Sequence, residues 1–196
     1  MSIRLMCRGC RLGALLFALL LPSAVAWAEA ADEPPVVFSV AGIDALGDAP
    51  DVLTLGAGIF NVIPNDDYHE VSPEGRLEYR YGRKWSAIGP MLGGYVNGEG
   101  GAFGYAAVYA DLRRGDWIAT PAFGVGAYRE GDGKDLGGVF QFHMALDVAY
   151  AFTNGDRLGM KLTHVSNASL HDRNPGVESL LLTYTLSLGR FAWADR

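Results

Sequence analysis

Three polar side chains near the C-terminal end of the sequence have the types and the spacing of an esterase site. His164 and Ser166 are two residues apart, so in a β-strand both point to one face, roughly 7 Å apart along the backbone. A neutral histidine at that distance can take the proton of a serine hydroxyl and make it a nucleophile. Glu178 could hold the imidazole in the required tautomer if it lies beside His164 on the neighbouring strand, a register that the sequence leaves open.

An ester or amide carbonyl under attack also needs hydrogen-bond donors for the oxyanion that develops. Asn167 follows the candidate nucleophile, and the backbone N–H groups of residues 167–169 are close to it in the chain. If Asn167 keeps the strand phase, its side chain points to the opposite face from Ser166. A backbone N–H group or a bulge at the strand end would then have to help bind the oxyanion.

Eight segments downstream of Asp51 have the apolar or alternating pattern of short β-strands. They are residues 52–63, 75–82, 86–96, 103–112, 117–128, 138–152, 157–168 and 177–190. Turn-forming sequences rich in Gly, Asn, Asp and Pro separate them. The connections alternate between longer and shorter, which is typical of outer-membrane barrels with long external loops and short periplasmic turns.

The last three of these segments each have one apolar face and one small or polar face. In a transmembrane barrel the apolar face meets lipid, whereas in a soluble lipocalin-like barrel it points inward. The periodicity alone does not choose between them. His164, Ser166 and Glu178 all lie on the apolar face, where ionisable groups are costly and indicate function.

The composition argues against a helical membrane protein and against a nucleic-acid-binding protein. The chain has 196 residues, of which 49% are hydrophobic, 19% are charged and 26 are glycine. No run of about 18 apolar residues in the body of the chain predicts a membrane-spanning helix. The net charge of −6 argues against a nucleic-acid partner.

Residues 1–30 have the pattern of a secretory signal peptide. Three arginines precede an apolar stretch at residues 12–21, and small residues of the A-x-A type follow it. Both cysteines, Cys7 and Cys10, lie in this segment, so the mature chain is expected to lack disulfides and thiol chemistry. Residues 31–51 are interpreted as an N-terminal leader or an additional strand, and residues 52–196 as the barrel.

The motif Leu162-Thr-His-Val-Ser-Asn-Ala168, followed by Asn174-Pro-Gly-Val-Glu-Ser179, resembles the signature of the outer-membrane lipid A 3-O-deacylases of the PagL type. The separation between the histidine and the glutamate fits that family, and Phe142 matches its upstream phenylalanine. The resemblance is strong over about residues 137–190 and rests on the barrel pattern over residues 52–136. Ser169 departs from the pattern, in which a glycine follows Asn-Ala.

This resemblance implies an all-β fold, an eight-stranded antiparallel transmembrane up-and-down β-barrel in the bacterial outer membrane with its signal peptide removed. It implies hydrolysis of the ester-linked 3-O-acyl chain of lipid A by a serine esterase whose triad faces the outer leaflet. The expected partners are lipid A or lipopolysaccharide as substrate and outer-membrane lipid, with no nucleic acid, and a homodimer stays open. No cofactor and no metal are implied.

The resemblance also implies a role for individual residues. Ser166 would be the nucleophile, His164 the base and Glu178 the acid that orients it. The other expected site residues are Asn167 and Ala168 for the oxyanion, Phe142 for the acyl site, and Asn174 and Gly176 for the loop.

Two other classes of protein stay open from the sequence. A non-enzymatic eight-stranded barrel, structural or adhesive, would carry the three polar residues as a chance cluster at its rim. A soluble lipocalin-like binder would turn the apolar face inward. Replacing Ser166 with alanine separates the first from an esterase, and solubility without detergent after removal of residues 1–30 would support the second.

Overall fold

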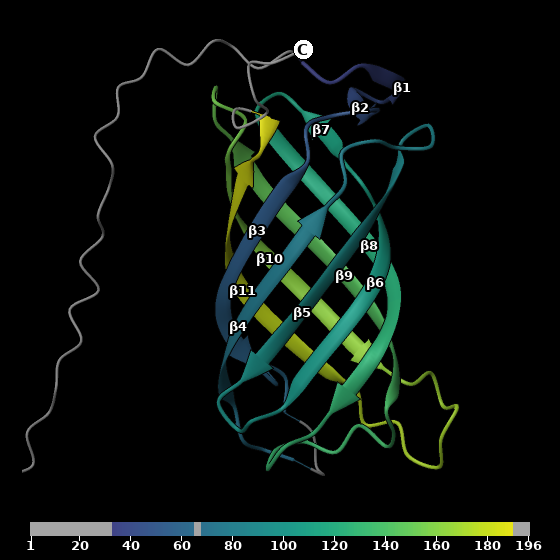
Figure 1. Cartoon of the computed structure of the whole chain (residues 1–196), viewed down its shortest axis with the longest axis vertical. Coiled ribbons are helices and arrows are strands. Elements are labelled where there is room, and N and C mark those ends of the chain that lie inside the picture. Colours follow the sequence, from purple (N-terminus) through teal and green to yellow (C-terminus); the bar gives the residue numbers. More distant parts are fainter. Residues whose placement is uncertain (1–32, 65–67, 190–196) are drawn as a thin grey trace, which may run out of the picture.

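The computed structural model describes residues 33–64 and 68–189, and it is a closed antiparallel β-barrel (Figure 1). Its long strands are β3 (Val52–Phe60), β4 (Ser72–Arg80), β5 (Ile88–Asn97), β6 (Ala102–Ala110), β8 (Trp117–Arg129), β9 (Phe140–Ala151), β10 (Arg157–Ser166) and β11 (Val177–Ser187). These strands pair with their neighbours in chain order, and the pairing of β11 with β3 closes the barrel. The predicted all-β, eight-stranded, antiparallel up-and-down barrel is therefore confirmed.

Alternating side chains on each strand give the barrel an apolar outer surface and a largely polar interior. On β10, Met160 and Leu162 point outward and are 56% and 49% exposed, whereas Lys161 and Thr163 point inward and are 3% and 1% exposed. The lipocalin-like alternative, with its apolar face inside, does not describe this molecule. No helix in the two described stretches is long and apolar enough to cross a membrane.

The barrel interior combines aromatic rings with paired charges. Phe60, Tyr95, Phe103 and Tyr105 pack in a buried cluster towards the end of the barrel where β10 terminates. Buried cations and carboxylates fill the space beside it, and five of the cations, Arg76, Arg80, Lys84, Arg157 and Lys161, have acidic partners. The ion pairs include Arg76–Glu74, Lys161–Glu78, Lys161–Asp147, Arg157–Asp111 and Lys84–Asp111.

The segment before the barrel forms a hairpin of two short strands, β1 (Val36–Val40) and β2 (Ile43–Leu46). The hairpin continues the barrel wall because β2 pairs with β7 (Leu112–Arg114), a short strand that follows β6. Figure 1 shows it at the end of the barrel opposite the loop that joins β10 to β11. Residues 36–46, for which the sequence left a strand or a leader open, are therefore strands. The predicted signal peptide, residues 1–30, lies outside the described residues.

Candidate active site

The pairing of β10 with its two neighbours brings the predicted esterase residues together. His164 lies directly opposite Glu178 on β11, and Ser166, the last residue of β10, lies opposite Phe142 on β9. The side-chain period of two places all four on the outer face of the barrel. The register that the sequence could not give is thus the one that a Glu–His–Ser relay requires.

The three side chains form a continuous hydrogen-bonded relay. Glu178 Oε1 is 2.8 Å from His164 Nδ1, and His164 Nε2 is 2.9 Å from Ser166 Oγ. With the carboxylate accepting the Nδ1 proton, Nε2 keeps a lone pair that can accept the Ser166 hydroxyl proton. The side chains of His164 and Glu178 are 43% and 27% exposed, so the relay lies on the surface and a substrate can reach it from outside.

A tight turn follows the serine and ends β10 two residues earlier than the predicted end at residue 168. Leu170 N donates to Asn167 O at 3.0 Å, and the two central residues, Ala168 and Ser169, have φ of 52° and 62°. Positive φ at both central positions defines a type I′ turn, a conformation that is costly for residues with a Cβ atom. Ser169 therefore stands where the PagL-type motif has a glycine, in a backbone conformation that suits glycine.

Asn167 is fully buried, and all three of its N–H donors are bound by residues of two neighbouring loops. Its side-chain Nδ2 donates to Leu136 O at 2.8 Å and to Arg173 O at 2.7 Å, and its backbone N–H donates to Asn174 Oδ1 at 3.0 Å. The N–H donors that Asn167 was expected to offer to the oxyanion therefore already have acceptors in the loops. Asn167 ties the loop of residues 167–176 to the loop of residues 130–139.

The same contacts leave three other donors beside the nucleophile. Because Asn174 Oδ1 accepts from Asn167, the amide orientation of Asn174 is set, and its Nδ2 donates to no other described residue. The backbone N–H groups of Ala168 and Ser169 also donate to no other residue within the described ranges. Free N–H donors can bind a developing negative charge.

Gly176 lets the returning chain pass close to the histidine. Its φ is 63°, and a Cβ atom at this position would lie 3.1 Å from His164 Cε1 and 3.8 Å from Ser166 Cβ. A side chain here would crowd the imidazole from the loop side. Gly176, predicted as a loop residue, is thus also a close neighbour of two members of the relay.

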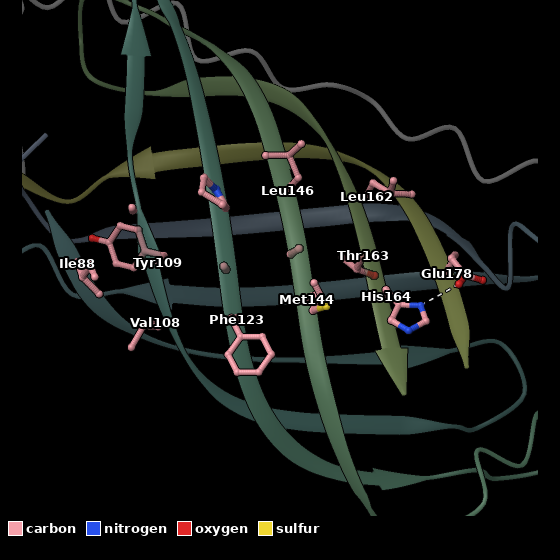
Figure 2. A pocket seen from close by; sticks show the side chains of 14 residues that line it. Ile88, Val108, Tyr109, Phe123, Met144, Leu146, Leu162, Thr163, His164 and Glu178 are labelled. Atoms are coloured by element: carbon pink, nitrogen blue, oxygen red, sulfur yellow. Dashed lines mark hydrogen bonds and ion pairs between the residues drawn. The ribbon is translucent and has the colours of Figure 1, made fainter. Parts of the chain in front are cut away.

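An apolar groove of about 570 Å³ runs across the outer wall from His164 and Glu178, and Ser166 is not among its lining residues (Figure 2). Met144 lies opposite His164, Phe123 opposite Met144 and Val108 opposite Phe123, so their side chains make one row across four strands. The groove residues that were not predicted as site residues include Ile88, Val108, Pro121, Phe123, Met144, Leu146 and Leu162. The two-residue period of each strand predicts that these side chains share one face of the sheet. Which of them lie side by side depends on the register between strands, which the sequence does not give.

Phe142, predicted to shape the acyl site, does not line this groove. It stacks instead against Phe123, with ring centroids 6.1 Å apart, and it meets Phe140 edge-on at 5.3 Å. Phe142 therefore supports the groove wall from the Ser166 side. No cluster of three or more potential metal ligands occurs within residues 33–64 and 68–189.

Comparison with known proteins connects this site to one family. Residues 63–187 match the family model described as lipid A 3-O-deacylase (PagL). The lipid A deacylase PagL of Pseudomonas aeruginosa is 30% identical over 137 residues, covering 57% of this chain and 79% of that protein. The PagL of Bordetella bronchiseptica is 36% identical over 52 residues, and this match spans 26% of the chain and only 29% of that relative.

A solved structure shows the same architecture. The crystal structure of the outer membrane enzyme PagL superimposes with a TM-score of 0.55 at 20% sequence identity, over 69% of this chain and 98% of that one. At this identity the match supports the barrel fold and carries no information on individual residues.

Proposed function

Because the chain belongs to the lipid A 3-O-deacylase (PagL) family, we propose that it is an outer-membrane serine esterase that hydrolyses the ester-linked 3-O-acyl chain of lipid A. The single observation that carries this proposal is the Glu178–His164–Ser166 relay on the outer face of the barrel, at one end of an apolar groove. A substrate that stays in the membrane needs its site on this face, because the lipid-facing wall is where acyl chains lie.

The proposed orientation places the relay in the outer leaflet. Outer-membrane barrels have long external loops and short periplasmic turns. Three of the four connections at the relay end, 61–71, 130–139 and 167–176, are longer than each connection at the other end, 81–87, 111–116 and 152–156, whereas the fourth, 98–101, is short. The relay end is thus the external end, and the ester of lipid A in the outer leaflet lies at its height.

The chemistry follows the roles that the geometry allows. His164 Nε2 takes the proton of Ser166, whose Oγ attacks the ester carbonyl, while Glu178 stabilises the imidazolium that forms. The tetrahedral intermediate then collapses, the sugar 3-oxygen leaves with the proton from His164, and an acyl-Ser166 ester remains. Water activated by the same imidazole attacks this ester, releasing the fatty acid and regenerating the serine.

The free donors of the loop are suited to the oxyanion. The N–H groups of Ala168 and Ser169 follow Ser166 closely in the chain, and Asn174 is held beside Asn167 by a hydrogen bond. These two N–H groups and the Nδ2 of Asn174 are not used in other described contacts. One such donor is worth about 10²–10³-fold in rate in other hydrolases. Asn167 contributes by fixing Asn174 and the turn rather than by binding the oxyanion itself.

The apolar groove supplies a place for the acyl chain. Met144, Phe123 and Val108 extend from His164 across the wall, so an acyl chain whose carbonyl is at Ser166 can lie along them. Apolar contact contributes about 0.8 kcal/mol per buried CH₂ group. The groove therefore favours a fatty-acyl ester over a short-chain ester.

Mass spectrometry of lipid A from cells that express the protein tests the proposal. Wild type is expected to remove one 3-hydroxyacyl group, and Ser166→Ala is expected to remove none at equal outer-membrane levels. Ser86→Ala, an exposed serine in the loop at the opposite end of the barrel, is the matched control and keeps full activity. Equal lipid A spectra for wild type and Ser166→Ala, with both barrels folded, would favour the non-enzymatic barrel.

A further inference from the structure

Directly behind the relay, an ion pair inside the barrel contacts both strands that carry it. Thr163 precedes His164 on β10, and Ser179 follows Glu178 on β11, so both point inward, and they are direct partners across the two strands. Ser179 Oγ donates to Glu74 Oε2 at 2.5 Å, and Arg76 NH2 lies 3.4 Å from Thr163 Oγ1. We call Glu74, Arg76, Thr163 and Ser179 the inner clamp.

The two charged members of the inner clamp are held firmly on β4. Arg76 Nε donates to Glu74 Oε1 at 2.8 Å, Arg76 NH2 forms an ion pair with the same oxygen at 2.7 Å, and both side chains are at most 1% exposed. The Arg76 guanidinium also lies 4.8 Å from the centre of the Tyr95 ring. The pair therefore connects β4, which lies two strands from β11 in the barrel wall, with the paired residues behind the relay.

The relay needs such a support because it lies at the end of its strand pair. Only one residue pair, Val165 with Val177, continues the β10–β11 ladder beyond His164 and Glu178. Strand ends with few remaining hydrogen bonds open easily. On the outer face, His164 and Glu178 are too exposed to be held in place by packing.

We propose that Glu74 and Arg76 are positioning residues for the triad: through Thr163 and Ser179 they fix the spacing and rotation of β10 and β11, and thereby the His164–Glu178 hydrogen bond. The catalytic significance of this inference rests on the proposed function. A buried ion pair is a weak source of stability, because desolvation offsets most of its attraction, so fixing one arrangement is its better attested use. A misplacement of about 1 Å at a catalytic group can cost about 10²-fold in rate.

The test removes the clamp contacts while leaving the ion pair and the relay side chains in place. The double variant Thr163→Val/Ser179→Ala replaces both hydroxyls with groups of similar shape. Thr183→Val is the matched control, because Thr183 also lies inward on β11 and donates to a buried carboxylate, Asp147, at 3.1 Å. Thr183 is four residues from Ser179, which is about 13 Å along the strand.

Three measurements on folded protein in detergent separate positioning from stability. The double variant is expected to lower kcat by about 10- to 100-fold with KM nearly unchanged. It should slow the labelling of Ser166 by a fluorophosphonate to a similar extent, and broaden or remove the downfield proton resonance of His164 Nδ1–H. Thr183→Val should retain all three properties. Wild-type kcat, labelling and proton resonance in the double variant, whatever its melting temperature, would overturn the proposal.

Two of the three measurements test the inner clamp independently of the proposed lipid A deacylase activity, and single variants can replace a double variant that fails to fold. Fluorophosphonate labelling and the proton resonance do not require lipid A, so the clamp can be supported even if wild type does not deacylate lipid A. If the double variant does not fold, Thr163→Val and Ser179→Ala are measured singly, and each is expected to lower the labelling rate at least about 3-fold. Two folded single variants that label at the wild-type rate would refute the clamp.

Discussion

Replacing Glu178 with glutamine tests whether its carboxylate acts on His164 as the relay geometry implies. The substitution keeps the shape of the side chain but removes the negative charge 2.8 Å from His164 Nδ1. It therefore removes stabilisation of the imidazolium that forms when Ser166 gives up its proton. The glutamine amide can also donate to Nδ1, which would leave the proton on Nε2 and block the base.

The magnitude follows from the exposure of the pair. A hydrogen bond to a charged group is worth about 1.5–3 kcal/mol, and each 1.36 kcal/mol is tenfold in rate. Water screens this interaction because the His164 and Glu178 side chains are 43% and 27% exposed. We therefore expect kcat to fall about 10- to 50-fold, well below the roughly 10⁴-fold effect of a fully buried orienting carboxylate.

The assay is release of the 3-hydroxy fatty acid from purified lipid A in mixed micelles, with barrel folding checked by heat-modifiable gel mobility. Glu130→Gln, at an exposed loop glutamate, is the matched control for loss of one negative charge and should keep wild-type kcat. A folded Glu178→Gln barrel with kcat within about twofold of wild type would refute the charge argument. A loss equal to that of Ser166→Ala would show that screening has been overestimated.

Two further predictions concern stability, measured as the temperature at which the folded barrel loses its fast gel mobility. Ser169→Gly should stabilise the fold by about 1 kcal/mol, because the φ of 62° is costly for a residue with a Cβ atom, whereas Ser169→Ala should give no such gain. Asp111→Asn should destabilise it by about 3–5 kcal/mol, because it leaves buried Arg157 and Lys84 without their carboxylate. Burial opposes the charge on Asp111, but Arg157, Arg80 and Lys84 outweigh it and hold the pKa of Asp111 well below its usual range. Its contribution is thus present above the unfolded pKa of about 3.9 and lost as the pH falls further, so acid should reduce the difference between wild type and Asp111→Asn.

The sequence was sufficient for the barrel and for the face on which the candidate site lies. The two-residue period of a strand determines that His164, Ser166 and Glu178 share a face, whatever their partners are. Strand ends were less accurate. The strand predicted to end at residue 168 ends at Ser166, because Asn167 and the next three residues form a turn closed by a backbone hydrogen bond.

Register and cross-barrel contacts could not be predicted, because they depend on how the sheet closes. The alignment of His164 with Glu178 is coupled to the ten-residue loop between β10 and β11, whose path is held by Asn167 and Asn174. The contact between Ser179 and Glu74 joins residues 105 positions apart in the chain, and it exists only because β11 closes on β3. Local patterning contains no information about such a pairing.

The exposure of the relay and the position of the inner clamp inside the barrel are related. A soluble esterase surrounds its triad with protein, which both orients the side chains and excludes water. In the function proposed for this chain the outer face must stay open to a lipid substrate, so the orienting contacts would come from inside the barrel and the substrate itself would cover the relay. When an acyl chain lies along Met144 and Phe123, water leaves the surface beside His164. The local dielectric falls, and the attraction between Glu178 and the imidazolium strengthens at the moment when the charge on His164 develops.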